Sequence, residues 1–214
     1  MDSIIFKHVI PHVFASREQQ DSDIWQQTVS FEKGKLYLLE ANSGKGKSTF
    51  CSYVIGYRND YTGSICFDRD DIRAFKVRDW VDVRQCHLSY LFQELRLFPE
   101  LTAYENIEIK NKITGFKTHL QIVDWFERLG IPDKMNERIG KMSFGQQQRV
   151  AMIRALVQPF DFILVDEPIS HLDDTNARIM GEILMEESGS QGAGIIVTSI
   201  GKHMELAYDH VLKI

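Results

Sequence analysis

Several features that mark particular classes of protein are scarce or missing in this sequence of 214 residues. It has three cysteines, Cys51, Cys66 and Cys86, an odd number without Cys-x-x-Cys spacing. We interpret them as reduced cytosolic thiols and not as disulfides or zinc ligands. No apolar run approaches the ~18–20 residues that span a bilayer. Residues 1–14 lack the basic region and long apolar core of a secretory signal. Any membrane role is therefore expected to run through a partner.

A basic excess is also missing, because the formal net charge is −5. This charge disfavours a dedicated nucleic-acid surface, so no nucleic-acid partner is expected. The chain shows no internal repeat, no low-complexity segment and no heptad run. Hydrophobic residues make up 43% of the chain and charged residues 26%, as in ordinary globular proteins. We predict one domain over residues 1–214, with room for a subdomain.

The strongest positive signal is the Gly-Lys-rich stretch at residues 40–49. It follows an apolar run at 36–39, expected to be a buried strand, and leads into 50–55, expected to begin a helix. Its glycines let backbone N–H groups curl around a polyphosphate, Lys47 can reach the outer phosphates, and the Ser48 hydroxyl can hold Mg²⁺. The alternative is a glycine-rich turn without a ligand, but this loop has the flanking strand and helix that the motif requires. The predicted nucleotide-binding residues are Asn42, Ser43, Gly44, Lys45, Gly46, Lys47, Ser48 and Thr49.

Two adjacent carboxylates, Asp166 and Glu167, follow a second apolar run at 162–165. Ligands of open α/β sheets bind beyond the carboxyl ends of the strands. Asp166 is therefore predicted to bind Mg²⁺, and Glu167 to orient or deprotonate the water that attacks a γ-phosphate. Alone, such a pair is explained equally well as a helix cap. The phosphate loop earlier in the chain favours the metal and catalytic roles.

The apolar runs predict an α/β protein with a mostly parallel, covered sheet. The block at 94–141 differs in texture and predicts a helical insertion, with Thr102 and Glu105 forming a capping box. We expect strands at 4–9, 29–31, 36–39, 88–92, 162–165 and 195–198 and near 211. An antiparallel hairpin is expected at 61–68. Helices are expected at 119–129, 145–157 and 175–187.

Residues 142–156, Met-Ser-Phe-Gly-Gln-Gln-Gln-Arg-Val-Ala-Met-Ile-Arg-Ala-Leu, lie between the two predicted sites. With this segment the chain resembles the ATP-binding-cassette (ABC) ATPases over nearly its full length. Gln93 is similar to the family's glutamine loop, and residues 170–173 are similar to its D-loop. The resemblance implies a P-loop NTPase fold with a mostly parallel central sheet, an antiparallel β-subdomain that includes 61–67, and an inserted α-helical subdomain at about 94–144.

The resemblance also implies a mechanism in which two nucleotide-binding domains close head to tail around two ATP molecules. Closure depends on the γ-phosphate, and hydrolysis releases it. Ser143 is equally well explained as a plain helix N-cap, and both roles can coexist. The implied catalytic residues are Glu167, Gln93 and Ser199; the metal ligands are Ser48, Gln93 and Asp166; and the residues offered to the nucleotide across the dimer or from the D-loop are Ser143, Gly145, Gln146 and Asp173.

An aromatic residue upstream of the phosphate loop stacks on adenine in this family. Phe14 is our candidate, with Trp25 behind it, and core packing explains either ring equally well.

Three departures from the family pattern matter. Ala41 replaces the first glycine of the phosphate loop, and Phe144 replaces the first glycine of the signature pair. Ser199 stands where the family has its switch histidine, and a serine cannot carry positive charge. His203 lies nearby, although a surface histidine explains it better. We hypothesise slow or partner-dependent ATP hydrolysis.

The leading functional hypothesis is the ATPase subunit of a membrane transporter, peripheral to the cytoplasmic membrane through a permease. The second cassette of the head-to-tail dimer is expected to be a second copy of this chain or a related cassette. An exposed groove bordered by Leu95, Leu97 and Phe98 would favour this hypothesis. The alternatives are a soluble ABC ATPase acting on nucleic acid or the ribosome, and a nucleotide-gated dimerisation module with poor turnover.

Overall fold

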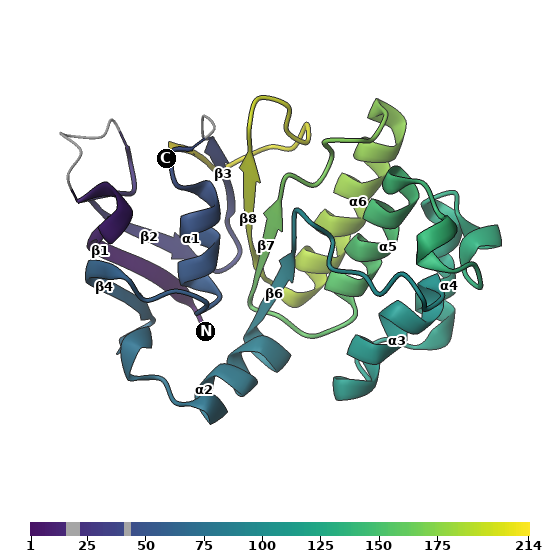
Figure 1. The fold of residues 1–214 in the computed structure, drawn as a ribbon, viewed down its shortest axis with the longest axis horizontal. Coiled ribbons are helices and arrows are strands. Elements are labelled where there is room, and N and C mark those ends of the chain that lie inside the picture. The colour runs from purple at the N-terminus through teal and green to yellow at the C-terminus, as the bar shows by residue number, and fades with distance from the viewer. Residues whose placement is uncertain (16–21, 41–43) are drawn as a thin grey trace.

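A computed structural model describes residues 1–15, 22–40 and 44–214, which form two sheets and the helices around them (Figure 1). Ala41, Asn42 and Ser43 lie outside the described residues. The antiparallel sheet has the order β2-β1-β4-β5, and the parallel sheet has the order β6-β7-β8-β3-β9. The strands are β1 Ser3–Pro11, β2 Thr28–Glu32, β3 Leu36–Glu40, β4 Tyr61–Phe67, β5 Asp70–Asp71, β6 Leu88–Leu91, β7 Phe162–Asp166, β8 Gly194–Ser199 and β9 His210–Lys213. The α-helices are α1 Lys47–Val54, α2 Val77–Asp82, α3 Ala103–Thr114, α4 His119–Arg128, α5 Phe144–Leu156 and α6 Asp174–Gln191.

The five-stranded sheet confirms the predicted parallel core. β7 and β8 are buried along their whole length, as expected for apolar strands covered on both faces. β8 pairs in parallel with both β7 and β3, and the register sets Asp166 opposite Thr198 and Glu40 opposite Ser199. The ends of β3 and β7 therefore meet at one edge of the sheet, which brings the phosphate loop and the carboxylate pair together.

An aromatic core fixes α1 between the two sheets. Phe50 of α1 stacks on Phe6 of β1 with ring centroids 5.0 Å apart, and Phe31 of β2 meets Phe50 edge-on at 5.5 Å. All three side chains are fully buried. The predicted antiparallel hairpin is confirmed, because β4 pairs with β1 and turns at Asp68 into β5. Both sheets thus hold the helix that begins with Lys47.

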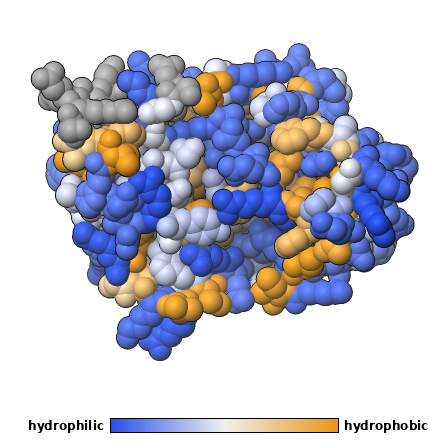
Figure 2. Space-filling view, in the orientation of Figure 1, coloured by the Kyte–Doolittle hydropathy of each residue, from blue (hydrophilic) through white to orange (hydrophobic). Residues whose placement is uncertain are grey.

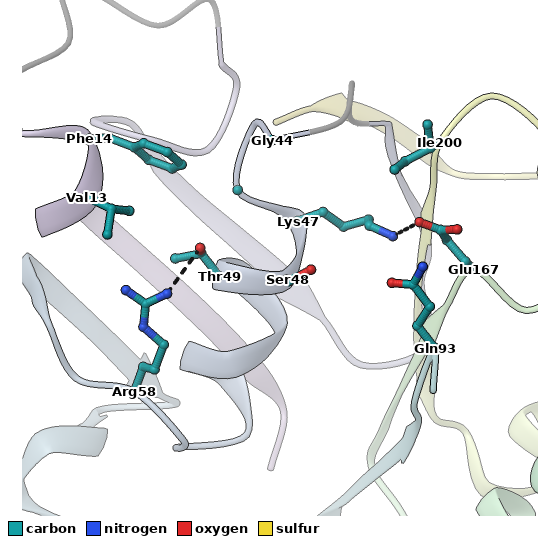
Figure 3. Close-up of a pocket in the computed structure, with 11 residues that line it drawn as sticks. Val13, Phe14, Gly44, Lys47, Ser48, Thr49, Arg58, Gln93, Glu167 and Ile200 are labelled. Carbon is teal, nitrogen blue, oxygen red and sulfur yellow. Dashed lines mark hydrogen bonds and ion pairs between the residues drawn. The ribbon is translucent and has the colours of Figure 1, made fainter. Parts of the chain in front are cut away.

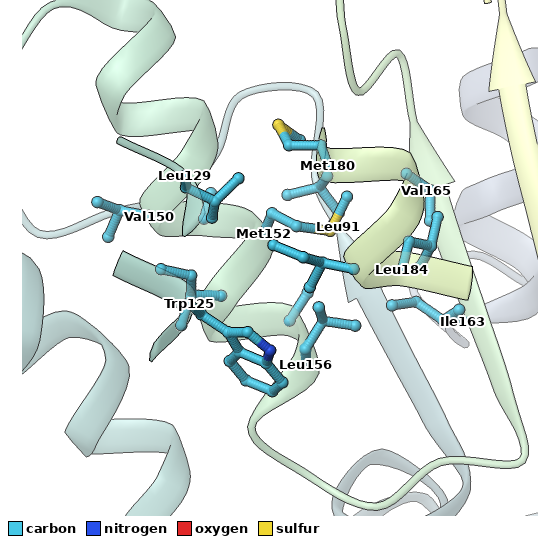
Figure 4. Packing of buried hydrophobic residues seen from close by; sticks show 14 of the residues in the cluster. Leu91, Trp125, Leu129, Val150, Met152, Leu156, Ile163, Val165, Met180 and Leu184 are labelled. Carbon is cyan, nitrogen blue, oxygen red and sulfur yellow. The ribbon is translucent and has the colours of Figure 1, made fainter. Parts of the chain in front are cut away.

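The second core lies between the parallel sheet and the helices α4, α5 and α6 (Figure 4). Trp125 and Leu129, at the end of α4, pack with Val150, Met152 and Leu156 of α5. The capping box at Thr102 and Glu105 is confirmed, and it begins a helix of 12 residues. The carboxyl end of α6 extends beyond the prediction to Gln191, where Gly192 in the left-handed region ends it.

An exposed groove bordered by Leu95, Leu97 and Phe98 would have favoured the transporter hypothesis, but Leu95 is buried. Its side chain is 4% exposed and belongs to the core with α5. Leu95 and Arg96 both have positive φ, and their carbonyl oxygens accept hydrogen bonds from the Arg154 guanidinium. This backbone turn rotates Leu95 inward and leaves Phe98 half-exposed. Within residues 1–15, 22–40 and 44–214, no helix is long and apolar enough to span a bilayer.

Candidate functional site

A hollow of about 480 Å³ opens where the phosphate loop faces the end of β7 (Figure 3). It is bounded by the first turn of α1 on one side and by Gln93 and Glu167 on the other. The lining combines a cation, a carboxylate, hydroxyl groups and an aromatic ring. Its residues are Val13, Phe14, Gly44, Gly46, Lys47, Ser48, Thr49, Arg58, Gln93, Glu167 and Ile200.

The Lys47 ammonium joins the two halves of the site. It donates a hydrogen bond to Glu167 and lies 3.1 Å from Oδ1 of Asp166. The Lys47 side chain is 6% exposed, so its charge is matched within the fold by these two carboxylates. Glu167 has a positive φ, and its backbone N–H donates to the carbonyl of Thr198. The strand end is thereby turned so that Glu167 faces the phosphate loop.

Asp166 is held by Lys47 of α1 and by neighbours in β6 and β8. The Thr198 hydroxyl donates to Oδ1, and the Tyr90 hydroxyl donates to Oδ2 at 3.1 Å. Burial, with the negative charge of Asp166 also contributing, raises the pKa of Tyr90, so this phenol remains a donor. A carboxylate oriented in this way, together with the exposed Ser48 hydroxyl, fits the hard oxygen ligands that Mg²⁺ prefers.

The phosphate loop is packed tightly against two aromatic rings. Gly46 has φ +114, and a Cβ there would lie 2.8 Å from Cε2 of Phe14 and 3.0 Å from Nε1 of Trp25. Trp25 Nε1 also donates to the carbonyl of Lys45 at 3.3 Å. The ring centroids of Phe14 and Trp25 are 6.2 Å apart. Only glycine meets both the backbone and the space requirements at Gly46.

The structure brings most of the predicted phosphate and catalytic residues to this hollow, and it leaves Ser199 out. Ser199 is 1% exposed, and its hydroxyl donates to the carbonyl of Lys202 at 2.6 Å. The next residue, Ile200, lines the hollow instead. His203 lies beyond this turn, with its ring 5.8 Å from that of Tyr208. The predicted residues that line the hollow are Phe14, Gly44, Gly46, Lys47, Ser48, Thr49, Gln93 and Glu167, with Asp166 beneath them.

A second group of predicted residues lies at the start of α5, outside the lining of the hollow. Ser143 caps this helix by accepting from the N–H of Gln146 at 3.3 Å, and the Gln146 side chain accepts from Ser143 N–H. A Cβ on Gly145 would lie 3.2 Å from the carbonyl oxygen of His171. Asp173 caps α6 by accepting from Asn176 N–H at 2.8 Å.

Phe144, which replaces the first glycine of the signature pair, lies at the surface of the molecule. The Phe144 ring is 42% exposed and packs edge-on against the His171 ring, with centroids 4.4 Å apart. The signature segment and the predicted D-loop therefore form one surface.

Sequence reasoning missed five residues of the site, of which Val13 lines the hollow beside Phe14. Arg58 donates to the Thr49 hydroxyl at 3.4 Å and lines the hollow, and Ile200 lines the opposite wall. Tyr90 and Thr198 hold Asp166 from behind. Thr198 was detectable in principle, because a polar residue at the end of an apolar strand faces the same sheet edge. Nothing local in the sequence marks Arg58 or Tyr90.

Comparison with known proteins decides the family. The family model "ABC transporter" matches residues 26–170. The chain belongs to the ABC transporter family. It is 30% identical over 207 residues to the ABC transporter ATP-binding protein YtrE of Bacillus subtilis, with 92% of this chain and 90% of that protein covered. It is 32% identical over 174 residues to the lipoprotein-releasing system ATP-binding protein LolD of Leptospira interrogans, with 80% and 73% covered.

The fold comparison agrees with this assignment. The chain matches the dimeric structure of MJ0796, a bacterial ABC transporter cassette, with a TM-score of 0.77 and 23% identity, covering 92% of this chain and 87% of that one. This likeness confirms the predicted P-loop NTPase fold. As a member of the ABC family, the chain is an ATPase, and the hollow is its candidate nucleotide site.

Proposed function

We propose that this chain is the ATP-hydrolysing subunit of a membrane transporter and works by ATP-dependent, head-to-tail pairing with a second cassette. The observation that carries the proposal is the convergence of Lys47 and Glu167 on one hollow, with Asp166 paired to Lys47 beneath it. Lys47 binds the outer phosphates, and the first turn of α1 adds its N–H groups. The phosphates compete with the two carboxylates for the Lys47 ammonium, which leaves Asp166 and Glu167 for the metal ion and for water.

Mg²⁺ would be held by Ser48, Asp166 and Gln93, and it would neutralise charge on the phosphates. Glu167 orients the attacking water and accepts its proton. The second cassette offers Ser143, Gly145 and Gln146 to this nucleotide, with Asp173 at the adjoining D-loop. Phe14 stacks on the adenine. We assign the helical block at about 94–144 as the subdomain that carries the signature surface.

We also propose that hydrolysis is slow. The Ser199 hydroxyl is used by the Lys202 carbonyl, and the wall that it vacates is occupied by the apolar side chain of Ile200. Among the described residues, no imidazole lines this hollow to hold the attacking water or to carry charge.

A membrane partner has a place to dock. A groove of about 250 Å³ lies between the segment Val81–Gln85 and the carboxyl-terminal half of α3. Figure 2 shows apolar patches over α2 and over α3 on either side of a hollow at the lower edge of the molecule. The exposed apolar side chains there are Val77, Val81, Ile109 and Ile113. An amphipathic helix of a permease fits such a groove.

Two experiments test the proposal. Wild-type turnover is expected below roughly 1 s⁻¹, and Glu167→Gln should lower it by at least about 100-fold. Ile200→His should raise the turnover above that of wild type, because it places an imidazole at the wall of the hollow. The matched variant is Ser199→His, which places the imidazole at the buried neighbouring position. Turnover in Glu167→Gln equal to wild type would contradict the catalytic assignment.

Affinity purification of the full chain from native membranes tests the partner. A copurifying membrane-spanning protein is expected. A salt-sensitive RNA or DNA complex in its place would contradict the transporter assignment.

A further inference from the structure

The groove between α2 and α3 contains positive charge that the fold does not balance. Arg84 and Lys110 both line it, and no acidic residue lines it among the described residues. Arg84 donates to the carbonyl of Ile55 at 3.0 Å and lies 5.1 Å from the Trp80 ring. Its partners are thus a carbonyl and two aromatic faces, because it also lies 5.6 Å from the centroid of the Tyr57 ring.

Lys110 is the more unusual of the two cations. Its Nζ donates to the hydroxyl of buried Ser89 at 3.1 Å, and that hydroxyl donates onward to the carbonyl of Ala155. An ammonium has three N–H donors. Ser89 takes one of them, so Lys110 brings further donors to the groove that it lines.

The charged groups around Lys110 oppose its charge. Burial, with the nearby Arg154 guanidinium also contributing, lowers the pKa of Lys110 to about 7. Glu108, two residues before Lys110, accepts from the Asn111 side chain and pairs with Lys112. Asp82, two residues before Arg84, lies 3.4 Å from His87. Within the part of the chain that the structure describes, Lys110 forms no ion pair with a carboxylate.

We infer that the helix which docks in this groove presents a carboxylate to the Lys110 ammonium. This inference rests on the proposed transporter function and adds the chemistry by which the partner is recognised. The apolar rim, with Val81 45% and Ile113 56% exposed, supplies the area for a helix but little selectivity. A half-buried cation in the lining of the groove rejects a partner that lacks an acidic side chain, because docking such a partner would desolvate an unpaired charge.

The direct test uses two designed 20-residue amphipathic helical peptides as probes. One carries a single glutamate at the centre of its apolar face, and the other carries glutamine there. At pH 6, fluorescence anisotropy should show the glutamate peptide binding wild type at least ten-fold more tightly. Lys110→Met should abolish this preference. Lys112→Met is the matched control two residues along, where the side chain is 77% exposed, and it should keep the preference. Equal binding of the two peptides, or binding of neither, overturns the inference.

A second experiment separates this inference from the transporter assignment. If a membrane protein copurifies with wild type, its docking helix should contain an aspartate or glutamate. Exchanging that residue for lysine should abolish copurification, and Lys110→Glu should restore it. A partner retained equally by wild type and Lys110→Met overturns the role of Lys110 and leaves the transporter assignment standing. Thermal unfolding of Lys110→Met reports folding, and its Tm is expected to be at least that of wild type, because the substitution removes a half-buried cation.

Discussion

The substitution Gly46→Ala probes the tight packing of the phosphate loop against Phe14 and Trp25. A non-glycine residue in the left-handed region costs about 1–2 kcal/mol, and Gly46 lies there at φ +114. The added Cβ would also lie 2.8 Å from Cε2 of Phe14. Ordinary carbon contacts are about 3.5–4.0 Å, so the ring or the loop must shift by roughly 1 Å.

The matched control is Gly44→Ala in the same loop. Gly44 has φ +78, but a Cβ there meets no atom within 4 Å among the described residues. It therefore carries the backbone cost alone, whereas Gly46→Ala adds an overpacking cost of about 1–3 kcal/mol. Since 1.4 kcal/mol is a factor of ten in affinity, ATP binding to Gly46→Ala should be about ten-fold weaker than to Gly44→Ala.

Isothermal titration with MgATP measures this difference, and thermal unfolding shows how much of the cost falls on folding. A Gly46→Ala protein that unfolds like Gly44→Ala and binds MgATP equally well would refute the packing argument. It would mean that the aromatic rings do not constrain the loop.

Three further predictions concern residues that support the site or the fold. Burial alone would raise the pKa of Asp161, but bonds from Lys33, the Met1 amino group and His87 lower it to about 2. The stabilisation from Asp161 is therefore present above about pH 4 and is lost as the pH falls toward 2. Asp161→Asn should lower the free energy of unfolding at pH 7 by about 2 kcal/mol. An acid unfolding curve that is unchanged in this variant would contradict the prediction. Arg154→Lys loses the paired hydrogen bonds to the loop after Gln93, so hydrogen exchange at residues 94–98 should accelerate by about ten-fold, and unaltered protection there would remove Arg154 as its clamp. Tyr90→Phe removes a donor to Asp166 and should raise the Mg²⁺ concentration for half-maximal hydrolysis by about ten-fold; an unchanged Mg²⁺ dependence would show that the phenol does not orient the carboxylate.

Features set by local chemistry were predictable from the sequence. The capping box at Thr102 and Glu105 and the N-cap at Ser143 depend on groups within one helical turn, and both formed as predicted. The phosphate loop and the carboxylate pair are local motifs on buried strands. Parallel pairing with β8 then brought them to one edge.

Features set by distant contacts were not predictable. Leu95 is buried because Arg154, 59 residues later in the chain, bonds its carbonyl in a left-handed turn. Ile200 lines the hollow and Ser199 does not, because the chain turns after β8 so that the Ser199 hydroxyl donates to the Lys202 carbonyl. The polarity of Leu95, Ser199 and Ile200 predicts neither the burial of Leu95 nor the position of Ile200 at the hollow.

Binding of MgATP by isothermal titration to wild type and to Lys47→Met tests the central claim most directly. The shared hollow predicts one MgATP per chain in wild type and an affinity at least about 100-fold lower in Lys47→Met, because the ammonium between the phosphate loop and the two carboxylates is lost. Equal affinity in the two proteins, or no binding to wild type, would contradict the account.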